Sequence, residues 1–327
     1  MLRELSVFQR SFPLVAPFRI SRGVKHVAEV VTVELRQGDK TGRGEAVPYA
    51  RYGESVDSVL EQMQALRAEL AAGMGRDELQ LRLPPGAARN ALDAALWDLE
   101  SQLSAVPVWA RLARPPHATL VSAITLGIDT PQRMGEAAAR LGSGLIKIKV
   151  DAEQPAARID AVRQAAPDAR LIVDPNESWD IALLRDMQPA LERARVDLLE
   201  QPLPAGADDD LVGFASRVPI CADEACHVTQ DLPRLRERYQ AINIKLDKTG
   251  GLTEAWRLLR AARADGFRIM VGCMVCSSLG ITPALEIARE AEFVDLDGPF
   301  WLQHDYPGGV RLRDGLLQPP APAFWGG

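Results

Sequence analysis

The sequence predicts an α/β protein whose larger part is a TIM-like barrel. From Lys149 onward, charged residues recur at an almost constant interval, in steps of 25, 26, 23 and 22 residues. They are Asp174, Glu200, Asp223 and Lys245. A period of about 25 residues accommodates one strand, one helix and two short loops. Each of these residues ends an apolar run or closely follows one, and barrel active sites lie at the carboxyl ends of the strands.

Eight apolar runs make up the predicted series of strands. They span residues 119–126, 145–150, 170–174, 196–200, 219–223, 241–246, 268–272 and 292–297. Between them the spacing is helical, as in 252–262, where Leu252, Trp256 and Leu259 belong to one apolar stripe. Strands that alternate with helices favour a parallel sheet covered by helices, and eight strands are enough to close a barrel.

The first 115 residues follow a different order. Strand patterns at 2–13, 27–35 and 42–47 predict an antiparallel meander, with loops expected at 17–23 and 49–55. Helical stripes come after them, which is an α+β arrangement. We therefore predict a capping domain over 1–115 and a barrel domain over 116–305. The tail, 306–327, is rich in glycine and proline, and we expect it to complete the capping domain.

Composition narrows the class of protein. The chain has 327 residues, 47% hydrophobic and 25% charged, which is typical of a globular protein with an ample core. A net charge of −6 without a basic block argues against a nucleic-acid partner. No apolar run approaches the roughly 20 residues of a membrane span, and charges near the N-terminus do not fit a signal peptide. We expect a cytoplasmic protein without a membrane partner.

Four cysteines fit that compartment. Cys273 and Cys276 form a C-x-x-C motif, which in principle suits redox chemistry or half of a zinc site. Cys221 and Cys226 have the wrong spacing for a zinc ribbon, and no His-x₃₋₅-His pattern follows. We interpret the two cysteines as small residues packed after a barrel strand.

Three carboxylates are expected to meet at the barrel mouth. Asp174, Glu200 and Asp223 end three consecutive strand patterns, and three carboxylates together cannot all stay ionised without a cation. A ligand set made only of oxygen favours a hard ion, and Mg²⁺ fits because it prefers few carboxylates together with water and substrate oxygens. A single strand-end acid is commonly satisfied by a helix N-terminus or an arginine. Three in register, with lysines on both flanks, favour a metal site.

Two lysines are expected on opposite sides of those acids. Lys149 lies on the second strand and Lys245 on the sixth, nearly across a barrel of eight. Lys147 shares a face with Lys149, because residues two apart on a strand point the same way. A nearby cation and a second lysine would lower the pKa of a catalytic lysine toward neutrality, so that it can act as a base.

This order of residues resembles the enolase superfamily, specifically its muconate-lactonizing-enzyme-like subgroup. The matching motifs are Lys147-Ile148-Lys149, Asp174-Pro175-Asn176, Glu200-Gln201-Pro202, Ala222-Asp223-Glu224 and Lys245-Leu246-Asp247-Lys248. The resemblance covers the whole chain and implies a modified (β/α)7β barrel under an α+β capping domain. Asp295-Leu296-Asp297 on the last strand is typical of dipeptide epimerases. Segments 88–99, 199–204, 243–252 and 295–298 resemble the L-Ala-D/L-Glu type of that family.

The resemblance implies an Mg²⁺-dependent isomerase that inverts the Cα of the C-terminal residue of L-Ala-D/L-Glu-type dipeptides, in murein peptide metabolism. Mg²⁺ and Lys147 would hold the substrate carboxylate, while Lys149 and Lys245 exchange the α-proton through an enediolate. Asp295 and Asp297, two residues apart on one strand, would share a face and bind the α-ammonium group. A glutamyl substrate also needs a cation for its side-chain carboxylate, and Arg22 is the candidate, with Arg19 and Arg51 behind it. The remaining candidates for substrate binding are Tyr52, Asn176 and Ser277.

Other activities of the same scaffold stay open. N-acylamino-acid racemase, o-succinylbenzoate synthase and cycloisomerase are the nearest alternatives, although their substrates have no free ammonium group for Asp295 and Asp297 to bind. Acid-sugar dehydratases generally use a histidine base near the seventh strand, where this chain has none. A non-catalytic peptide- or metal-binding barrel would not need amines on both faces. The sequence also leaves open the second residue of the dipeptide, shaped by 272–279, and the oligomeric state.

Overall fold

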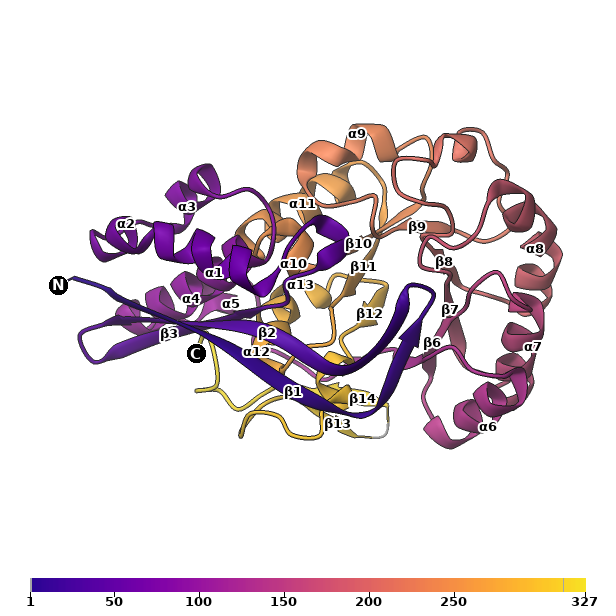
Figure 1. Cartoon of the computed structure of the whole chain (residues 1–327), viewed down its shortest axis with the longest axis horizontal. Helices are drawn as coiled ribbons and strands as arrows, with labels where there is room; N and C mark the ends of the chain where they lie inside the picture. The colour runs from indigo at the N-terminus through magenta and orange to yellow at the C-terminus, as the bar shows by residue number, and fades with distance from the viewer. Residues whose placement is uncertain (1, 314) are drawn as a thin grey trace.

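The computed structural model describes residues 2–313 and 315–327. An antiparallel sheet in the order β1-β2-β3 begins the chain. Its strands are β1 (Glu4–Ile20), β2 (Gly23–Gln37) and β3 (Lys40–Ala46). Figure 1 shows the β1–β2 hairpin as a long indigo ribbon that leaves the N-terminal helices and reaches toward the barrel.

The loop expected at 17–23 is instead the end of that hairpin. Strand pairing continues to Ile20, which lies opposite Gly23, so that only Ser21 and Arg22 form the turn. The register shifts once, between Pro13 and Phe18, where proline cannot donate a ladder hydrogen bond. The sequence interpretation was wrong here because it took Pro17 and the two arginines as loop signals.

Helices cover one side of this sheet. They are α1 (Val56–Ala65), α2 (Arg67–Ala71), α3 (Arg76–Arg82), α4 (Ala87–Ser104) and α5 (Val108–Arg111), after a short 3₁₀ turn, η1 (Ala50–Tyr52). The α4 backbone approaches β3 very closely, because Gly42 and Gly44 have no side chain there. A Cβ atom on Gly44 would lie only 2.0 Å from the carbonyl oxygen of Ala91. The glycines are therefore what allows this helix to pack on the sheet.

The barrel consists of eight parallel strands in the order β5 to β12. Their bounds are β5 (Ile124–Leu126), β6 (Leu145–Lys149), β7 (Arg170–Asp174), β8 (Leu198–Glu200), β9 (Ile220–Ala222), β10 (Ala241–Ile244), β11 (Arg268–Gly272) and β12 (Phe293–Asp295). A hydrogen bond of 2.7 Å from Ala123 N to Val294 O joins the first strand region to the last. The predicted barrel is confirmed.

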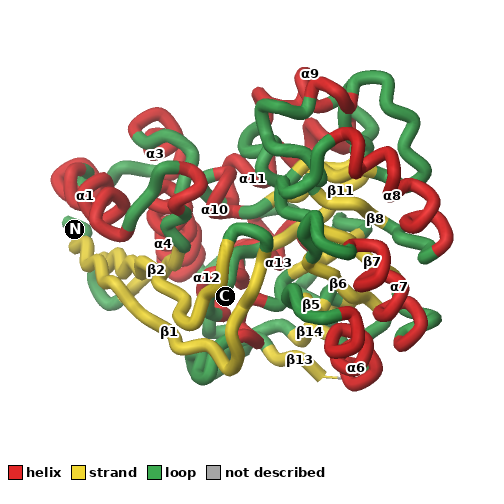
Figure 2. The backbone as a smooth tube through the Cα atoms, turned by 45° about the vertical axis from the view of Figure 1, so that its right-hand side comes forward, coloured by secondary structure: helices red, strands yellow, loops and turns green. Residues whose placement is uncertain are grey.

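Helices and short turns follow the barrel strands, and η5 comes after the last of them. They are α6 (Pro131–Leu141), α7 (Pro155–Ala165), α8 (Ile181–Arg193), η2 (Asp209–Leu211), η3 (Thr229–Asp231), α9 (Leu232–Leu235), α10 (Leu246–Thr249), α11 (Leu252–Ala264), α12 (Ser278–Ile281), η4 (Thr282–Ala284), α13 (Leu285–Ala288) and η5 (Gly298–Trp301). Figure 2 shows α6, α7 and α8 along the outside of the strands. Within the described residues, no helix combines the length and the apolar composition of a membrane-spanning segment.

The first predicted strand, 119–126, is divided between two sheets. Its first part is β4 (Leu120–Val121), which pairs with β14 (Leu316–Gln318), and β14 pairs with β13 (Arg311–Arg313). Only β5 continues into the barrel. Only Ser122 and Ala123 lie between the two parts, with no glycine or proline, so the sequence pattern could not separate them.

The end of the chain contacts the N-terminal unit. Trp325 donates its indole N–H to the Arg43 carbonyl oxygen over 3.0 Å, and Gly326 N donates to Asp98 Oδ1 over 2.9 Å. Both Phe324 and Trp325 are buried. These contacts support the expected return of the tail, while the boundary between capping and barrel domains stays a prediction.

Candidate active site

An apolar layer closes the inside of the barrel, and a polar layer lies directly above it. The apolar layer takes one buried side chain from each strand region: Ala123, Leu145, Ile172, Leu198, Cys221, Ala241, Met270 and Phe293. Two residues further along each strand, the same inward face carries Thr125, Lys147, Asp174, Glu200, Asp223, Asn243, Gly272 and Asp295. The two-residue period of parallel strands therefore places the predicted charged residues in one ring.

Lys147 connects three of the carboxylates in this ring. Its Nζ atom lies 3.2 Å from Asp174 Oδ2, 2.7 Å from Glu200 Oε2 and 2.8 Å from Asp295 Oδ2. All four side chains are buried. Lys147 thus sits among the acids of strands β7, β8 and β12, as the alternation along β6 predicts.

The other two lysines, Lys149 and Lys245, lie two residues beyond the ring, toward the carboxyl ends of β6 and β10. Lys149 Nζ is 2.5 Å from Asp174 Oδ2, and Lys245 Nζ is 2.7 Å from Asp223 Oδ2. Lys245 follows β10 with an extended backbone and precedes α10. Because β6 and β10 are four places apart in a ring of eight, the two amines approach from opposite sides.

The carboxylates respond differently to this environment. Burial alone would raise the pKa of Asp174, but Lys149 and Lys147 outweigh it and lower that pKa to about 2. Burial likewise opposes ionisation of Asp223, yet Lys245 and Lys248 hold its pKa well below the usual range. Burial and the neighbouring Asp174 raise the pKa of Glu200 to about 7. Asp174 and Asp223 are therefore ionised at neutral pH, whereas Glu200 gains or loses its proton near pH 7.

In this arrangement of side chains, the pKa values of Lys147 and Lys245 are raised rather than lowered. Burial lowers the pKa of Lys147, but Asp295, Glu200 and Asp174 outweigh it and hold that pKa well above its usual value. The pKa of Lys245 is also raised, because Asp223 outweighs burial. The prediction assumed that a cation occupies the carboxylates, whereas here the ammonium groups pair with them directly.

The donor set of the three acids fits a hard cation. Asp174, Glu200 and Asp223 end neighbouring strands, and Glu200 Oε2 accepts no well-oriented hydrogen bond although Lys147 Nζ is near. Asn243 Nδ2 holds the other oxygen of Glu200 at 2.8 Å. As they lie, no three Asp, Glu, His or Cys side chains among residues 2–313 and 315–327 come together as a metal site, because the lysines stand between them.

Asp295 and Asp297 line the same cavity from different backbone positions. Asp295 ends β12, whereas Asp297 lies beyond the strand and precedes η5, so they do not share one strand face as expected. Asp297 Oδ2 accepts a hydrogen bond from Thr125 N over 2.7 Å, while Asp295 Oδ1 accepts none. Burial and the adjacent Asp295 raise the pKa of Asp297 to about 6.

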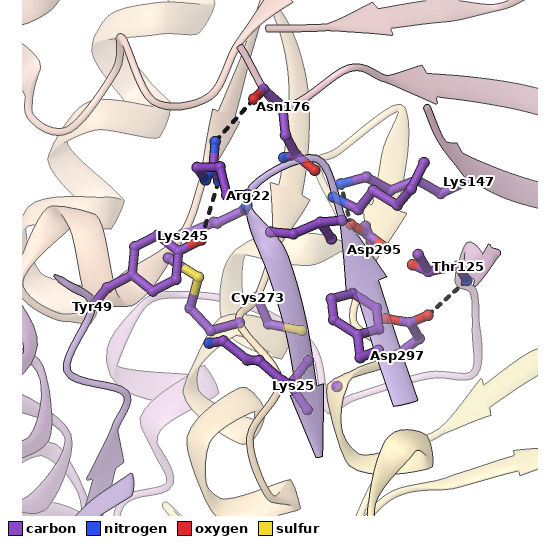
Figure 3. A pocket seen from close by; sticks show the side chains of 16 residues that line it. Arg22, Lys25, Tyr49, Thr125, Lys147, Asn176, Lys245, Cys273, Asp295 and Asp297 are labelled. Carbon is purple, nitrogen blue, oxygen red and sulfur yellow. Dashed lines mark hydrogen bonds and ion pairs between the residues drawn. The ribbon is translucent and has the colours of Figure 1, made fainter. Parts of the chain in front are cut away.

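The cavity is closed on one side by the β1–β2 hairpin. Its wall combines the lysines and aspartates with Phe18, Ile20, Met274 and Val275 (Figure 3). Arg22, at the hairpin turn, lies 2.8 Å from Glu224 Oε1 and 3.1 Å from Glu177 Oε2. It also donates to the carbonyl oxygen of Asn176 over 3.1 Å. The turn is therefore tied to the barrel loops by a doubly paired arginine.

The structure brings some of the other predicted residues to this cavity and places the rest elsewhere. Asn176 lines it, and its Nδ2 atom lies 3.2 Å from Asp174 Oδ2. Arg19 and Tyr52 line two neighbouring cavities instead. Ser277 is buried and donates its hydroxyl to Glu45 Oε2 over 2.6 Å, which joins β3 to the loop after β11.

The C-x-x-C motif lies at the edge of the site. Cys273 lines the cavity and Cys276 is buried, and both are free thiols. The hydrogen bond with the neighbouring Cys273 thiol, together with burial, raises the pKa of Cys276 well above its usual value. That environment suits a packed side chain.

Family comparison decides what this barrel is. Residues 130–323 match the family described as "Enolase C-terminal domain-like". Residues 2–112 match "Mandelate racemase / muconate lactonizing enzyme, N-terminal domain". The chain belongs to the enolase superfamily. The resemblance predicted from the strand-end residues is confirmed.

Two relatives in the enolase superfamily are equally similar in sequence but differ in substrate. The L-Ala-D/L-Glu epimerase of Escherichia coli is 45% identical over 97% of this chain and 99% of its own. The N-acetyl-D-glutamate racemase of Pseudoalteromonas sp. is also 45% identical, over 91% of this chain and 95% of its own.

Solved structures of the superfamily show the same architecture. An enolase family member from Agrobacterium tumefaciens, described as homologous to dipeptide epimerases and bound to sodium and L-Ala-L-Glu, has a TM-score of 0.97. It is 45% identical, covering 99% of this chain and 100% of that one. A dipeptide epimerase from Methylococcus capsulatus, complexed with Mg and L-Arg-D-Lys, has a TM-score of 0.89 at 32% identity, covering 98% and 97%.

Sequence reasoning missed residues that support this enolase-superfamily site from behind. The Gln201 side-chain oxygen accepts from Asp223 N over 2.9 Å and from Ala225 N over 3.0 Å, so it ties the end of β8 to the end of β9. Lys248 Nζ lies 2.7 Å from Asp223 Oδ1, opposite Lys245. Both residues stand in the quoted motifs, one and three places after a predicted functional residue. Their position beside those residues was the available signal.

Proposed function

We propose that the protein is an Mg²⁺-dependent dipeptide epimerase that inverts the Cα of the C-terminal residue of L-Ala-D/L-Glu-type dipeptides. The observation that carries this proposal is the placement of Lys149 at the end of β6 and of Lys245 directly after β10, on two strands four places apart, where they contact Asp174 and Asp223 respectively. Inversion at Cα requires one group that removes the α-proton from one face of the substrate and a second group that returns a proton to the opposite face.

Asp174, Glu200 and Asp223 would hold the Mg²⁺ ion, and the Methylococcus capsulatus epimerase complexed with Mg supports this assignment. When bound, the ion would stabilise the negative charge that develops on the substrate carboxylate as the α-proton leaves. Asn176 and Asn243 donate hydrogen bonds to Asp174 and Glu200, so both acids are held in place.

The protein's own residues then bind and orient the dipeptide. Lys147, kept protonated by its carboxylate neighbours, holds the C-terminal carboxylate of the substrate. Asp295 offers a buried oxygen without a hydrogen-bond donor to the α-ammonium group, and Asp297 lies beside it. One of Lys149 and Lys245 takes the α-proton, and the other returns one to the opposite face. The hairpin and its apolar residues exclude water while this happens.

A second candidate is racemisation of an N-acylated amino acid. The N-acetyl-D-glutamate racemase of Pseudoalteromonas sp., a relative of this chain, is the reason to consider it. An acylated substrate has no ammonium group, so the Oδ1 atom of Asp295 would gain no donor from it and the buried carboxyl group of Asp297 no ammonium partner. This observation favours the dipeptide. o-Succinylbenzoate synthesis is disfavoured for the same reason. We further propose a role in murein peptide metabolism in the cytoplasm, which rests on the sequence resemblance alone.

The test is epimerisation and α-proton exchange in deuterated water, with Mg²⁺ and either L-Ala-L-Glu or L-Ala-D-Glu. Replacing Lys149 or Lys245 with alanine should lower epimerisation at least roughly 100-fold, because each removes one acid–base group. Deuterium wash-in should survive for one isomer only in each variant. Lys40→Ala, outside the cavity, is the control.

Full epimerisation by a Lys245→Ala variant would end the two-base mechanism. Substrate choice is tested by comparing L-Ala-L-Glu with N-acetyl-L-glutamate in the wild type and in Asp295→Asn. The dipeptide reaction should fall and any reaction of the acylated substrate should not. Faster turnover of the acylated substrate by the wild type would favour the racemase instead.

A further inference from the structure

The side-chain amide of Gln201 has a partner for each of its hydrogen-bonding positions. Its oxygen accepts from Asp223 N over 2.9 Å and from Ala225 N over 3.0 Å. Its nitrogen donates to the Leu203 carbonyl oxygen and to the Tyr239 hydroxyl oxygen, both over 2.9 Å. An amide group offers two acceptor and two donor positions, so all of them are used. The amide is therefore held in one orientation, with its oxygen toward the backbone at Asp223.

The backbone of Gln201 needs this support. Its φ angle is 33°, in the left-handed region that residues other than glycine rarely adopt. A strained conformation of this kind persists only where the surrounding structure determines it. Gln201 directly follows Glu200, so a rotation at Gln201 would displace one proposed metal ligand and release the backbone of another, Asp223.

Asp208 sets the direction of the hydrogen bond between Tyr239 and Gln201. The Tyr239 hydroxyl lies 2.6 Å from Asp208 Oδ2, and an ionised carboxylate can only accept. Burial and the contact with Asp208 raise the pKa of Tyr239, so the hydroxyl keeps its proton and donates it to Asp208. The lone pairs of the hydroxyl oxygen are then left to accept from Gln201. Arg234 Nη1, 3.1 Å from Asp208 Oδ1, supplies the counter-charge.

Gln201, Tyr239 and Asp208 form one buried network that joins three segments of the chain. Gln201 directly follows β8, Asp208 directly precedes η2, and Tyr239 lies between α9 and β10. Among the described residues, neither Asp208 nor Tyr239 belongs to the wall of the active-site cavity. Any effect of these two residues on the site therefore has to pass through Gln201.

We propose that Tyr239 and Asp208 are positioning residues for the Mg²⁺ site, and that they act by fixing the Gln201 amide. The fixed amide holds the backbone where β8 and β9 end, which is where Glu200 and Asp223 enter the site. This inference rests on the proposed function, because it takes Glu200 and Asp223 as metal ligands.

The first experiment measures the Mg²⁺ affinity of the full chain by calorimetric titration. Tyr239→Phe keeps the ring and removes the hydroxyl. Asp208→Asn keeps the shape of the side chain but can also donate, so the Tyr239 hydroxyl is no longer forced to accept from Gln201. Each variant should weaken Mg²⁺ binding roughly 10-fold. The double variant should be no weaker than the worse single one, because both substitutions act through one amide.

Asp209→Asn is the matched control. Asp209 is the next residue in the chain, is exposed and pairs with Arg238, so its replacement removes the same charge outside the network. This variant should bind Mg²⁺ as the wild type does.

The second experiment reads the network without any metal, by hydrogen exchange of backbone amides followed by NMR. The N–H groups of Asp223 and Ala225 both donate to the Gln201 oxygen. They should exchange roughly 10-fold faster in Tyr239→Phe and Asp208→Asn than in the wild type. Amides in the middle of α8 should keep their rates, because this helix is outside the network.

The two experiments together decide the inference. Unchanged exchange at Asp223 and Ala225, or an equal acceleration throughout α8, would overturn it. Faster exchange with unchanged Mg²⁺ affinity would also overturn it, because the network would then serve the fold alone. A wild type that binds no Mg²⁺ would refute the proposed metal site, and the exchange rates would still decide whether Tyr239 and Asp208 fix Gln201.

Discussion

Glu45 makes the stability of this protein depend on pH in a direction that can be calculated. The carboxylate is buried on β3 and accepts hydrogen bonds from Ser277 N over 2.8 Å and from the Ser277 hydroxyl. Burial raises its pKa from 4.5 to about 7, and Asp305 and Asp247 add to the effect. The folded protein therefore holds a proton at pH 6 that the unfolded chain has already released.

That difference gives both the sign and the size of the effect. Between pH 4.5 and 7 the folded state binds more protons than the unfolded state, so the free energy of unfolding falls as pH rises. At about 1.4 kcal/mol for each tenfold difference in proton affinity, the shift of the Glu45 pKa to about 7 amounts to about 3 kcal/mol. The loss levels off about one pH unit above 7, where Glu45 is ionised in the folded state as well.

Glu45→Gln removes this dependence and keeps an acceptor for Ser277 N. Between pH 4.5 and 8, the wild type should therefore lose about 3 kcal/mol more of its free energy of unfolding than Glu45→Gln does. Urea unfolding followed by circular dichroism at each pH measures it. Glu34→Gln, on the half-exposed side of β2, controls for the loss of charge. A difference that stays constant across this range would refute the reasoning.

Two further predictions concern how the site and the capping sheet are supported. Gln201→Met should weaken Mg²⁺ binding roughly 10- to 100-fold in calorimetric titration, because it frees the backbone between two proposed ligands. Gln188→Met, a buried glutamine in α8 far from the site, should leave that affinity unchanged, and equal losses in both would indicate general destabilisation. Gly44→Ala should lower the free energy of unfolding by about 1–3 kcal/mol or more, since its Cβ would meet the Ala91 carbonyl. Gly144→Ala, with open space around it, should cost less than about 0.5 kcal/mol, and a similar cost at both positions would contradict the close-packing argument.

Strand register accounts for most of what could be predicted about the site. Side chains alternate along a strand, and the carboxyl ends of parallel strands meet at one rim of a barrel. Spacing alone therefore placed Lys147, Asp174, Glu200 and Asp223 in one ring, as the structure shows. The same reasoning failed for Asp297, because the strand ends before it and the backbone turns into η5.

The sequence by itself determined the barrel, the order of its charged residues and the family, because these follow from local periodicity and from motifs read along the chain. Only the tertiary structure decided which strand β4 joins, since its partner β14 lies almost 200 residues away. It alone also showed that Arg22 is paired with Glu224 and Glu177. Whether a charge is free to bind a ligand depends on which groups the folded chain brings within a few ångströms, and no local pattern records that distance.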